Sequence, residues 1–339
     1  MDAFYLVKYG AAATAFERRA LSLSPPAKGQ VQIEVEAFGL NFADVMARHG
    51  LYREAPPLPA VLGYEVTGRI AAVGPDTLAP PVGSRVLGFT RFGGYATHVN
   101  TDARSVVSIP AHMPAADACA LATQGCTAWF AATQLFRLRA GEHVLVQAAA
   151  GGVGSLLVQL AKMQGCVVYG TAGSDNKLQL LRTLGTDHPI NYRTTHFADA
   201  VKQLNNGKGI DVVFDNLGGK AFKQALGLLA PGGRIVGYGA AERLDRRGPF
   251  ATLQLVLGFG FHNPVQWLMK SQTVAGLNML RVAERNPLLL QEGMTAMLEL
   301  YQTKKIKVIN GGEYTAGKLH EAHEALGGRT TTGKLVVRW

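Results

Sequence analysis

The sequence has few of the features that mark secreted, membrane-spanning or disordered proteins. Only 3 of its 339 residues are cysteine, too few for a scaffold held together by disulfide bonds. No stretch reaches the roughly 18 consecutive apolar residues that a membrane-spanning helix needs. The N-terminus lacks the basic segment and apolar run of a signal peptide. Apolar residues make up 47% of the chain and charged ones 17%, so we expect a folded, cytoplasmic protein.

The chain is basic, with a formal net charge of +10, which is compatible with a nucleic-acid or membrane-surface partner. The first 120 residues carry ten basic and ten acidic side chains, so the whole excess lies in the remaining two thirds. It forms no long uninterrupted block, and aromatic residues do not alternate with the basic clusters as they do in single-strand binders. We therefore predict no DNA partner and keep RNA or a membrane surface as less favoured alternatives.

Short strands are expected in the first third of the chain. Residues 31–36 alternate apolar and polar side chains, which is typical of a half-buried strand. Glycine and proline recur every few residues from 39 to 83, a spacing that predicts short strands in a small barrel or sandwich.

The pattern changes near residue 115, where an alanine-rich helical segment runs to 138. Strand-like runs then alternate with helical ones, which predicts βαβ units and a parallel sheet. The expected strands are 143–148, 166–171, 188–191, 210–215, 234–238 and 273–277, followed by a long helix at 288–301.

A glycine-rich turn lies between the first of these strands and a helical pattern. Residues 149–154 read Ala-Ala-Gly-Gly-Val-Gly, a Gly-x-Gly-x-x-Gly pattern with alanine in the first place. Gly151, the middle glycine of the pattern, lets the backbone approach a pyrophosphate, and Gly154 allows close packing of helix on strand. In a strand–turn–helix setting this predicts dinucleotide binding.

The cofactor can be predicted from the end of the second strand. An NAD site carries Asp or Glu there, but residues 170–174 are Gly-Thr-Ala-Gly-Ser. Small neutral residues leave room for a 2′-phosphate, and Lys177, Tyr192 and Arg193 follow closely. Asp175 could turn inward and repel that phosphate. We predict NADPH in preference to NADH.

Further motifs make the chain resemble the medium-chain dehydrogenase/reductases. Within them it is most similar to the zinc-independent quinone oxidoreductases, nearest the synaptic-vesicle membrane protein subgroup. The resemblance covers nearly the whole chain. The segments that carry it are 39–48, 50–52, 57–59, 63–65, 82–86, 148–154, 186–192 and 215–219.

This resemblance implies an α/β protein with two domains. Residues 1–118 and 284–339 would form a GroES-like β-rich catalytic domain, and residues 119–283 a Rossmann domain with a doubly wound parallel sheet. In such a fold the edge strand near 273–277 can pair with its twin, so we expect a homodimer.

The resemblance also implies site residues. Asn41 would lie beside the nicotinamide and the acceptor oxygen, with Tyr52 and Tyr64 as candidate catalytic hydrogen-bond donors. For Tyr52, a core aromatic with its hydroxyl at the surface is equally compatible. Asp44 fits a structural hydrogen bond better than catalysis. The cofactor-binding candidates are Asn41, Thr127, Ala150, Gly151, Gly152, Val153, Gly154, Gly173, Ser174, Lys177, Tyr192, Asn216, Gly237, Tyr238 and Lys334.

We predict no metal site. Where zinc-dependent relatives carry Cys, His and Cys, this chain has Asn41, Tyr64 and, less securely aligned, Thr123, none of them a usual zinc ligand. The three cysteines, at 119, 126 and 166, lie in apolar or alanine-rich settings and are expected to be buried thiols.

Hydride transfer without a metal suits acceptors that need little activation. The sequence therefore favours an NADPH-dependent quinone reductase. The alternatives are an enoyl or enone reductase, or a non-catalytic RNA- or lipid-binding protein of the same fold.

Two further features of the sequence have no role in the predicted reaction. His320 and His323 are three residues apart, but neighbouring apolar residues favour a helix with a solvated polar face over a metal pair. Residues 253–261 are apolar and favour a core or cleft-lining helix, with a lipid contact as the weaker alternative.

Overall fold

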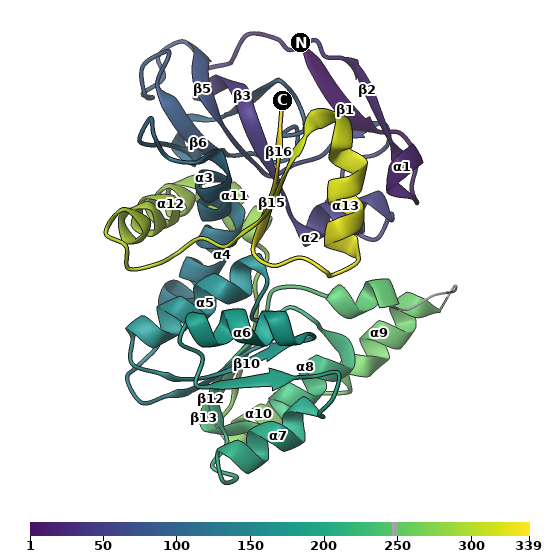
Figure 1. The fold of residues 1–339 in the computed structure, drawn as a ribbon, viewed down its shortest axis with the longest axis vertical. Helices are drawn as coiled ribbons and strands as arrows, with labels where there is room; N and C mark the ends of the chain where they lie inside the picture. Colours follow the sequence, from purple (N-terminus) through teal and green to yellow (C-terminus); the bar gives the residue numbers. More distant parts are fainter. Residues whose placement is uncertain (246–247, 249) are drawn as a thin grey trace. The chain divides into compact units, whose positions relative to one another are not determined.

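The computed structural model describes residues 1–245, 248 and 250–339. The chain forms two units, Met1–Cys126 together with Met279–Trp339, and Thr127–Asn278. These units divide the chain a few residues away from the boundaries expected above. Both chain ends belong to the first unit (Figure 1).

The first unit is built around a long strand, β3 (Gln30–Leu40), in a mostly antiparallel sheet. The strand order is β15-β16-β3-β5-β6-β8, and β7 also pairs with β3. The bounds are β5 (Glu65–Val73), β6 (Arg85–Phe89), β7 (His98–Asp102), β8 (Val106–Ser108), β15 (Asn310–Thr315) and β16 (Lys334–Arg338). A smaller sheet has the order β2-β1-β4, from β2 (Phe16–Ala20), β1 (Asp2–Leu6) and β4 (Ala60–Val61).

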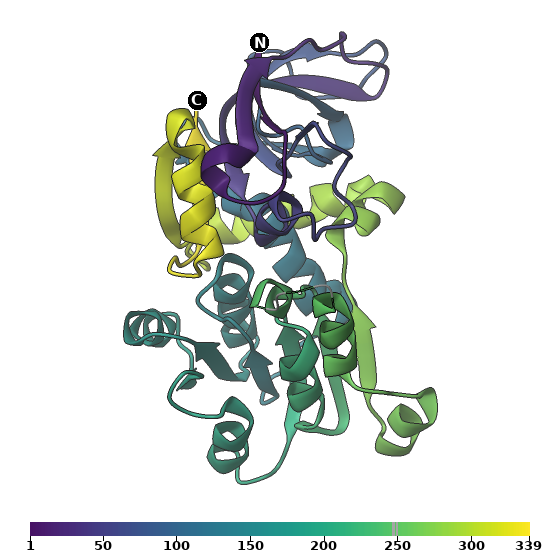
Figure 2. The same cartoon turned by 90° about the vertical axis from the view of Figure 1, so that its right-hand side faces the viewer.

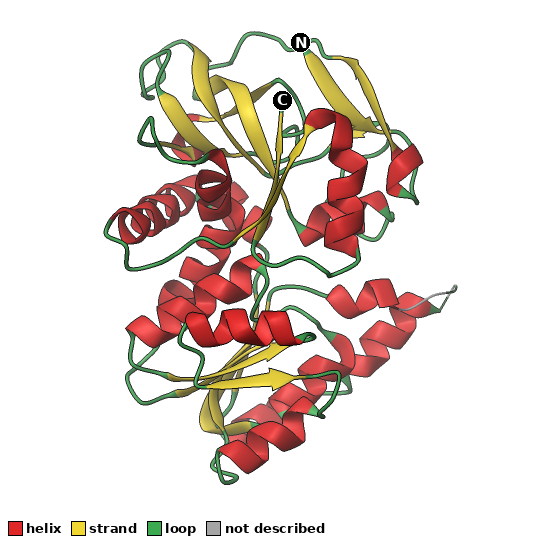
Figure 3. Cartoon of the chain, in the orientation of Figure 1, coloured by secondary structure: helices red, strands yellow, loops and turns green. Residues whose placement is uncertain are grey.

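Helices pack around these sheets (Figure 3). They are α1 (Ala12–Ala15), α2 (Phe42–Arg48), α3 (Ala115–Ala120), α11 (Met279–Arg285), α12 (Pro287–Gln302) and α13 (Leu319–Gly327). A π-helical turn at Leu121–Gly125 and the short α4 (Cys126–Trp129) follow α3. The alanine-rich segment is thus helical, as predicted.

The end of β3 brings distant parts of the chain together. Its alternating half, 31–36, was predicted as a strand, but the strand continues to Leu40 because Phe38 and Leu40 are buried in one core cluster and Ala37 in another. Leu335 of β16 lies opposite Leu40, and Val66 of β5 lies opposite Phe38. The C-terminal strand therefore lies beside an N-terminal one, as Figure 2 shows in yellow and purple.

The second unit contains a parallel sheet with the order β11-β10-β9-β12-β13-β14. The bounds are β9 (His143–Val146), β10 (Val167–Ala172), β11 (His188–Asn191), β12 (Ile210–Asp215), β13 (Leu229–Gly237) and β14 (Thr273–Gly276). The order reverses between β9 and β12, the place where open α/β sheets bind ligands at the carboxyl ends of their strands.

Helices cover both faces of this sheet. Figures 1 and 3 show α5 and α6 on one face and α7 and α8 on the other. The helices of this unit are α5 (Gly152–Met163), α6 (Asp175–Thr183), α7 (Phe197–Leu204), α8 (Gly219–Leu226), α9 (Ala251–Phe259) and α10 (Pro264–Lys270). The predicted pairing of a GroES-like β-rich domain with a Rossmann-type parallel-sheet domain is confirmed.

Residues 253–261 were expected to form a core or cleft-lining helix; the core interpretation is wrong, and the cleft-lining one stays a prediction. Helix α9 buries only Ala251 and Leu255, whereas Leu253, Val256 and Leu257 are each more than half exposed. Apolar composition alone cannot tell a core helix from one whose apolar side faces outward. No helix in the described part of the chain is long and apolar enough to cross a membrane.

Candidate functional site

In the first unit, Asn41 lies where β3 ends and α2 begins. Asn41 and Asp44 form a capping box, in which each side chain faces the other residue's backbone N–H. The Asp44 carboxyl accepts the Asn41 backbone N–H at 2.8 Å. The Asn41 carboxamide has further partners.

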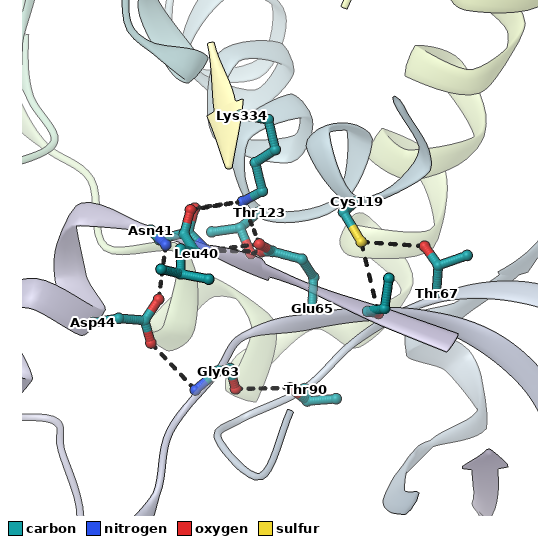
Figure 4. Close-up of polar contacts among 11 residues, drawn as sticks. Leu40, Asn41, Asp44, Gly63, Glu65, Thr67, Thr90, Cys119, Thr123 and Lys334 are labelled. Carbon is teal, nitrogen blue, oxygen red and sulfur yellow. Dashed lines mark hydrogen bonds and ion pairs between the residues drawn. The ribbon is translucent and has the colours of Figure 1, made fainter. Parts of the chain in front are cut away.

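Those partners are the charged side chains of Glu65 and Lys334, both fully buried (Figure 4). Asn41 Nδ2 lies 2.8 and 2.9 Å from the two Glu65 carboxylate oxygens. Lys334 Nζ lies 3.1 Å from Asn41 Oδ1 and 3.1 Å from the Leu40 carbonyl, and it forms an ion pair with Glu65. The Thr123 hydroxyl donates to the same carboxylate.

The network depends on a missing side chain at Gly39. A Cβ there would overlap the Glu65 carboxylate and the Lys334 side chain. Sequence reasoning placed Lys334 among the cofactor-binding residues and gave no role to Glu65. The available signal was a carboxylate directly before the apolar, buried Val66, but its partner is 269 positions away.

The side chains at the expected metal positions do not fit a catalytic zinc ion. Asn41, Tyr64 and Thr123 offer an amide, a phenol and a hydroxyl, while zinc prefers thiolate, imidazole and carboxylate. The Glu65 carboxylate is already ion-paired with Lys334. Within residues 1–245, 248 and 250–339, no group of three or more His, Cys, Asp or Glu side chains is placed to hold a metal ion.

The cysteines are buried free thiols, as predicted. Burial raises the pKa of Cys119 to about 12 and that of Cys166 to about 11, and it raises the pKa of Cys126 as well. All three therefore stay protonated near neutral pH, which makes them poor nucleophiles and poor metal ligands.

Tyr52 and Tyr64 lie next to each other in the first unit. Their rings meet edge to face, with centroids 6.3 Å apart. Tyr64 is buried, and its hydroxyl makes no hydrogen bond within the described residues. Burial raises the pKa of Tyr52 to about 12 and that of Tyr64 further. Both phenols thus remain neutral and can donate a hydrogen bond.

Asp44 has the structural role expected for it. Besides capping α2, its carboxyl accepts the Gly63 N–H at 3.2 Å (Figure 4). Burial raises the pKa of Asp44 to about 8, and the nearby Glu65 charge adds to that increase. The two backbone N–H groups favour the ionised form but do not outweigh the desolvation.

The prediction of a solvated helix face fails for His323. This side chain is fully buried on α13, beside Ala322, with Nε2 3.1 Å from the Tyr95 hydroxyl. Burial and the Arg48 charge lower the pKa of His323 to about 3. A buried neutral imidazole with an aromatic partner is a structural element of the core rather than a metal ligand.

In the second unit, the glycine turn joins β9 to α5 as predicted. Ala148 takes a positive φ of 47°, and the Ala149 N–H donates to the Thr171 carbonyl at 2.9 Å. A Cβ at Gly154 would lie 2.5 Å from the Ala148 oxygen and 2.8 Å from the Ala149 Cα. Helix α5 begins without a side-chain cap, so its first N–H groups can bind a phosphate.

Residues expected to hold a 2′-phosphate gather at the end of β10. A Cβ at Gly173 would lie 2.5 Å from the Tyr192 hydroxyl, so these two residues are in contact. Lys177 is half-buried, and its pKa is lowered by burial and by the nearby charge of Arg193. Two cations this close suit an anionic ligand. Ser174 is the N-cap of α6 and likewise makes no capping bond.

Asp175, the residue expected to oppose a phosphate, is exposed in the first turn of α6. Its Oδ1 lies 3.5 Å from Asn191 Nδ2, an amide at the end of the next strand, β11. Small and cationic side chains thus gather beside the end of β10.

Several buried oxygens at the carboxyl ends of β9, β12 and β13 have no hydrogen-bond partner within the described residues. They are Gln147 Oε1, Asp215 Oδ2, Asn216 Oδ1 and the Tyr238 hydroxyl. Buried polar atoms normally have partners, and a cofactor lying along this sheet edge would supply them. Gly237 ends β13 directly before Tyr238, and Thr127 is buried at the start of the unit.

A GroES-like β-rich unit joined to a Rossmann-type parallel-sheet unit defines the class of medium-chain dehydrogenase/reductases. Two family models match the chain. Residues 27–111 match the alcohol dehydrogenase GroES-like domain, and residues 152–291 match the zinc-binding dehydrogenase domain.

Known proteins narrow this assignment. The rat synaptic vesicle membrane protein VAT-1 homolog is 33% identical over 317 residues, which is 92% of this chain and 77% of that protein. The Escherichia coli quinone oxidoreductase solved with NADPH superposes with a TM-score of 0.87 at 27% identity, over 100% of both chains. The CurK enoyl reductase superposes with a TM-score of 0.85 at 27% identity, covering 99% of this chain and 98% of its own.

The chain belongs to the medium-chain dehydrogenase/reductase oxidoreductases, in the branch that contains quinone oxidoreductases and VAT-1 homologues. Mycobacterial polyketide synthases also match at 30 to 33% identity, but the chain spans only 14% of their length.

Proposed function

We propose that this chain is an NADPH-dependent reductase of quinones that transfers hydride without zinc. The observation that carries the proposal is the donor set around Asn41. It comprises a carboxamide held by a buried Glu65–Lys334 ion pair, together with two neutral phenols. These groups can hydrogen-bond an acceptor oxygen, whereas they are poor ligands for a Lewis-acidic metal.

The proposed reaction needs little from the protein beyond binding and orientation. When bound, NADPH supplies a hydride, and a quinone that accepts it together with one proton becomes a hydroquinone. The second unit would hold the pyrophosphate at the N-terminus of α5 and the 2′-phosphate near Lys177 and Tyr192. The first unit would hold the acceptor oxygen through Asn41, with Tyr52 or Tyr64 as a further donor.

An acceptor panel tests this proposal. Purified protein, stripped of metal with a chelator and checked by mass spectrometry, is assayed for NADPH oxidation with benzoquinone and phenanthrenequinone. We expect turnover with quinone, a clear preference for NADPH over NADH, and no loss of rate after chelation. Turnover that disappears on chelation and returns with added zinc would contradict the metal-free mechanism.

An enoyl reductase is the second candidate, and the likeness to the CurK enoyl reductase favours it. The same carboxamide and phenols can stabilise the enolate oxygen that forms when hydride adds to an α,β-unsaturated thioester. Crotonyl N-acetylcysteamine thioester, added to the panel, separates the two activities. A higher kcat/KM for the thioester than for either quinone would assign the chain to enoyl reduction.

We also propose a homodimer formed through β14. This strand is at the edge of the parallel sheet, and its residues are exposed or half-buried. Unpaired edges of sheets favour pairing with another chain. Size-exclusion chromatography with light scattering should give twice the monomer mass, and a Val274→Pro variant should give the monomer mass.

A further inference from the structure

We propose that the buried Glu65–Lys334 pair acts as a positioning device that fixes which way the Asn41 carboxamide faces. The inference deepens the proposed function, because it rests on Asn41 holding the acceptor oxygen. It assigns to Glu65 and Lys334 a role in the reaction through Asn41, with neither residue acting on the acceptor itself.

The argument begins with the symmetry of an amide. The oxygen and the NH₂ group of asparagine have nearly the same shape, so packing alone does not distinguish the two orientations. A carboxylate only accepts hydrogen bonds, and an ammonium group only donates them. With Glu65 on one side and Lys334 on the other, only one orientation satisfies both contacts.

That orientation leaves one N–H for a ligand. Nδ2 is nearly equidistant from the two Glu65 oxygens, at 2.8 and 2.9 Å. The two oxygens of one carboxylate subtend a much smaller angle at Nδ2 than the angle between its two N–H bonds. One N–H directed between the two oxygens satisfies both, which leaves the second N–H for a ligand; among the described residues, the hydrogen bonds of Nδ2 go to this carboxylate alone.

The surroundings of the pair support a function beyond stability. Two buried charges are costly to desolvate, and apolar side chains of similar volume would commonly stabilise a core as well or better. Here the sheet instead brings Glu65, at the start of β5, and Lys334, at the start of β16, to opposite sides of β3. Thr123 and the Leu40 carbonyl satisfy further hydrogen bonds of the two charged groups, and Gly39 makes room for both.

A charge-neutral variant, Glu65→Gln with Lys334→Met, tests the proposal without leaving one buried charge unpaired. Quinone reduction is measured for wild type, this double variant, Asn41→Ala, and the triple combination. We expect the double variant to lower kcat by about 10- to 100-fold while the NADPH Kd changes by less than about twofold. In the Asn41→Ala background the same two substitutions should change kcat by less than about twofold. If the kcat loss in the triple variant equals the loss in Asn41→Ala multiplied by the loss in the double variant, the proposal is overturned.

A second measurement does not depend on activity. In protein labelled with ¹⁵N-asparagine, the Asn41 side-chain amide signals are assigned by their loss in Asn41→Ala. We expect these signals to move strongly in the double variant, because the N–H shared with the carboxylate loses its charged acceptor. Signals that stay in place would overturn the positioning role, even if wild type reduces quinones. Signals that move while wild type reduces neither quinone nor enone would uphold the geometry and reject the proposed function.

The matched control is Glu142→Gln with Arg234→Met. This pair is also largely buried, with contacts of 2.9 Å, but it lies in the second unit, with Glu142 directly before β9 and Arg234 within β13. We expect this control variant to leave the Asn41 amide signals in place. Its kcat should stay within about twofold of the wild-type value. Equal effects from both pairs would show that the first pair acts only through general stability.

Discussion

The two units of this chain build their sites in opposite ways. In the second unit the proposed cofactor-binding features come from short stretches of neighbouring residues, such as the glycine turn and the segment after β10. In the first unit the network joins Asn41, Glu65, Thr123 and Lys334, which are spread over nearly the whole sequence. A backbone-built site, formed by the main chain of neighbouring residues, can be recognised as a motif in the sequence. A side-chain-built site, formed by residues far apart in the sequence, exists only once the sheet has formed.

The largest expected difference between the units is the cost of breaking an ion pair. Lys334→Met leaves the Glu65 carboxylate buried without its cation, so we expect the free energy of unfolding to fall by about 3–5 kcal/mol. Arg234→Met, in the less deeply buried pair of the second unit, should cost about 1–2 kcal/mol. Chemical denaturation gives the free energy of unfolding of both variants. Equal losses of that free energy would contradict the predicted difference between the two ion pairs.

The next effect tests the backbone-built site. Gly154→Val places a side chain against the Ala148 oxygen and the Ala149 Cα, so α5 must move away from β9. We expect NADPH affinity to fall by about 100-fold, measured by fluorescence titration. Gly317→Ala, where a Cβ meets nothing within 4 Å, is the steric control and should bind NADPH as wild type does.

A smaller effect is expected from removing one cation at the 2′-phosphate site. Lys177→Met should weaken NADPH binding by about tenfold and leave NADH binding nearly unchanged, because a charge-assisted hydrogen bond is lost only with the phosphate. The two Kd values measure this directly. Lys208→Met, an exposed lysine in the same unit, is the matched control, and an equal loss for NADPH in that variant would point to general electrostatics.

The smallest expected effect concerns pH and the first unit. Because the pKa of His323 is lowered from 6.5 to about 3 in the folded chain, the unfolded chain binds a proton first as pH falls. The stability from neutral His323 is present above pH 6.5 and is lost progressively below it, by about 1–2 kcal/mol near pH 5. His323→Gln should flatten this decline in melting temperature. His320→Gln, on the same helix, should keep it.

The sequence predicted best where structure is local. Strands β11 and β12 occupy the residues expected of them, 188–191 and 210–215, because strand-like and helical segments alternate regularly along this part of the chain. The glycine turn and the cluster near Lys177 were also found, since their residues are close in sequence.

The remaining features depend on contacts between distant residues. His323 was expected on a solvated face because its partner, Tyr95, is 228 positions away. The role of Glu65 was missed because its ion pair forms only when β16 reaches the sheet beside β3. The apolar side of α9 is exposed rather than part of a core, one of the two interpretations given to it, because composition does not say what a helix packs against.

The most direct test of the central claim compares wild type with Asn41→Ala in metal-free protein, using quinone as the acceptor. Both the kcat and the Kd for NADPH are measured. If Asn41 holds the acceptor oxygen while the second unit binds the cofactor, kcat should fall by about 100-fold and the Kd should change by less than about threefold. An unchanged kcat, or a loss confined to NADPH binding, would contradict the account.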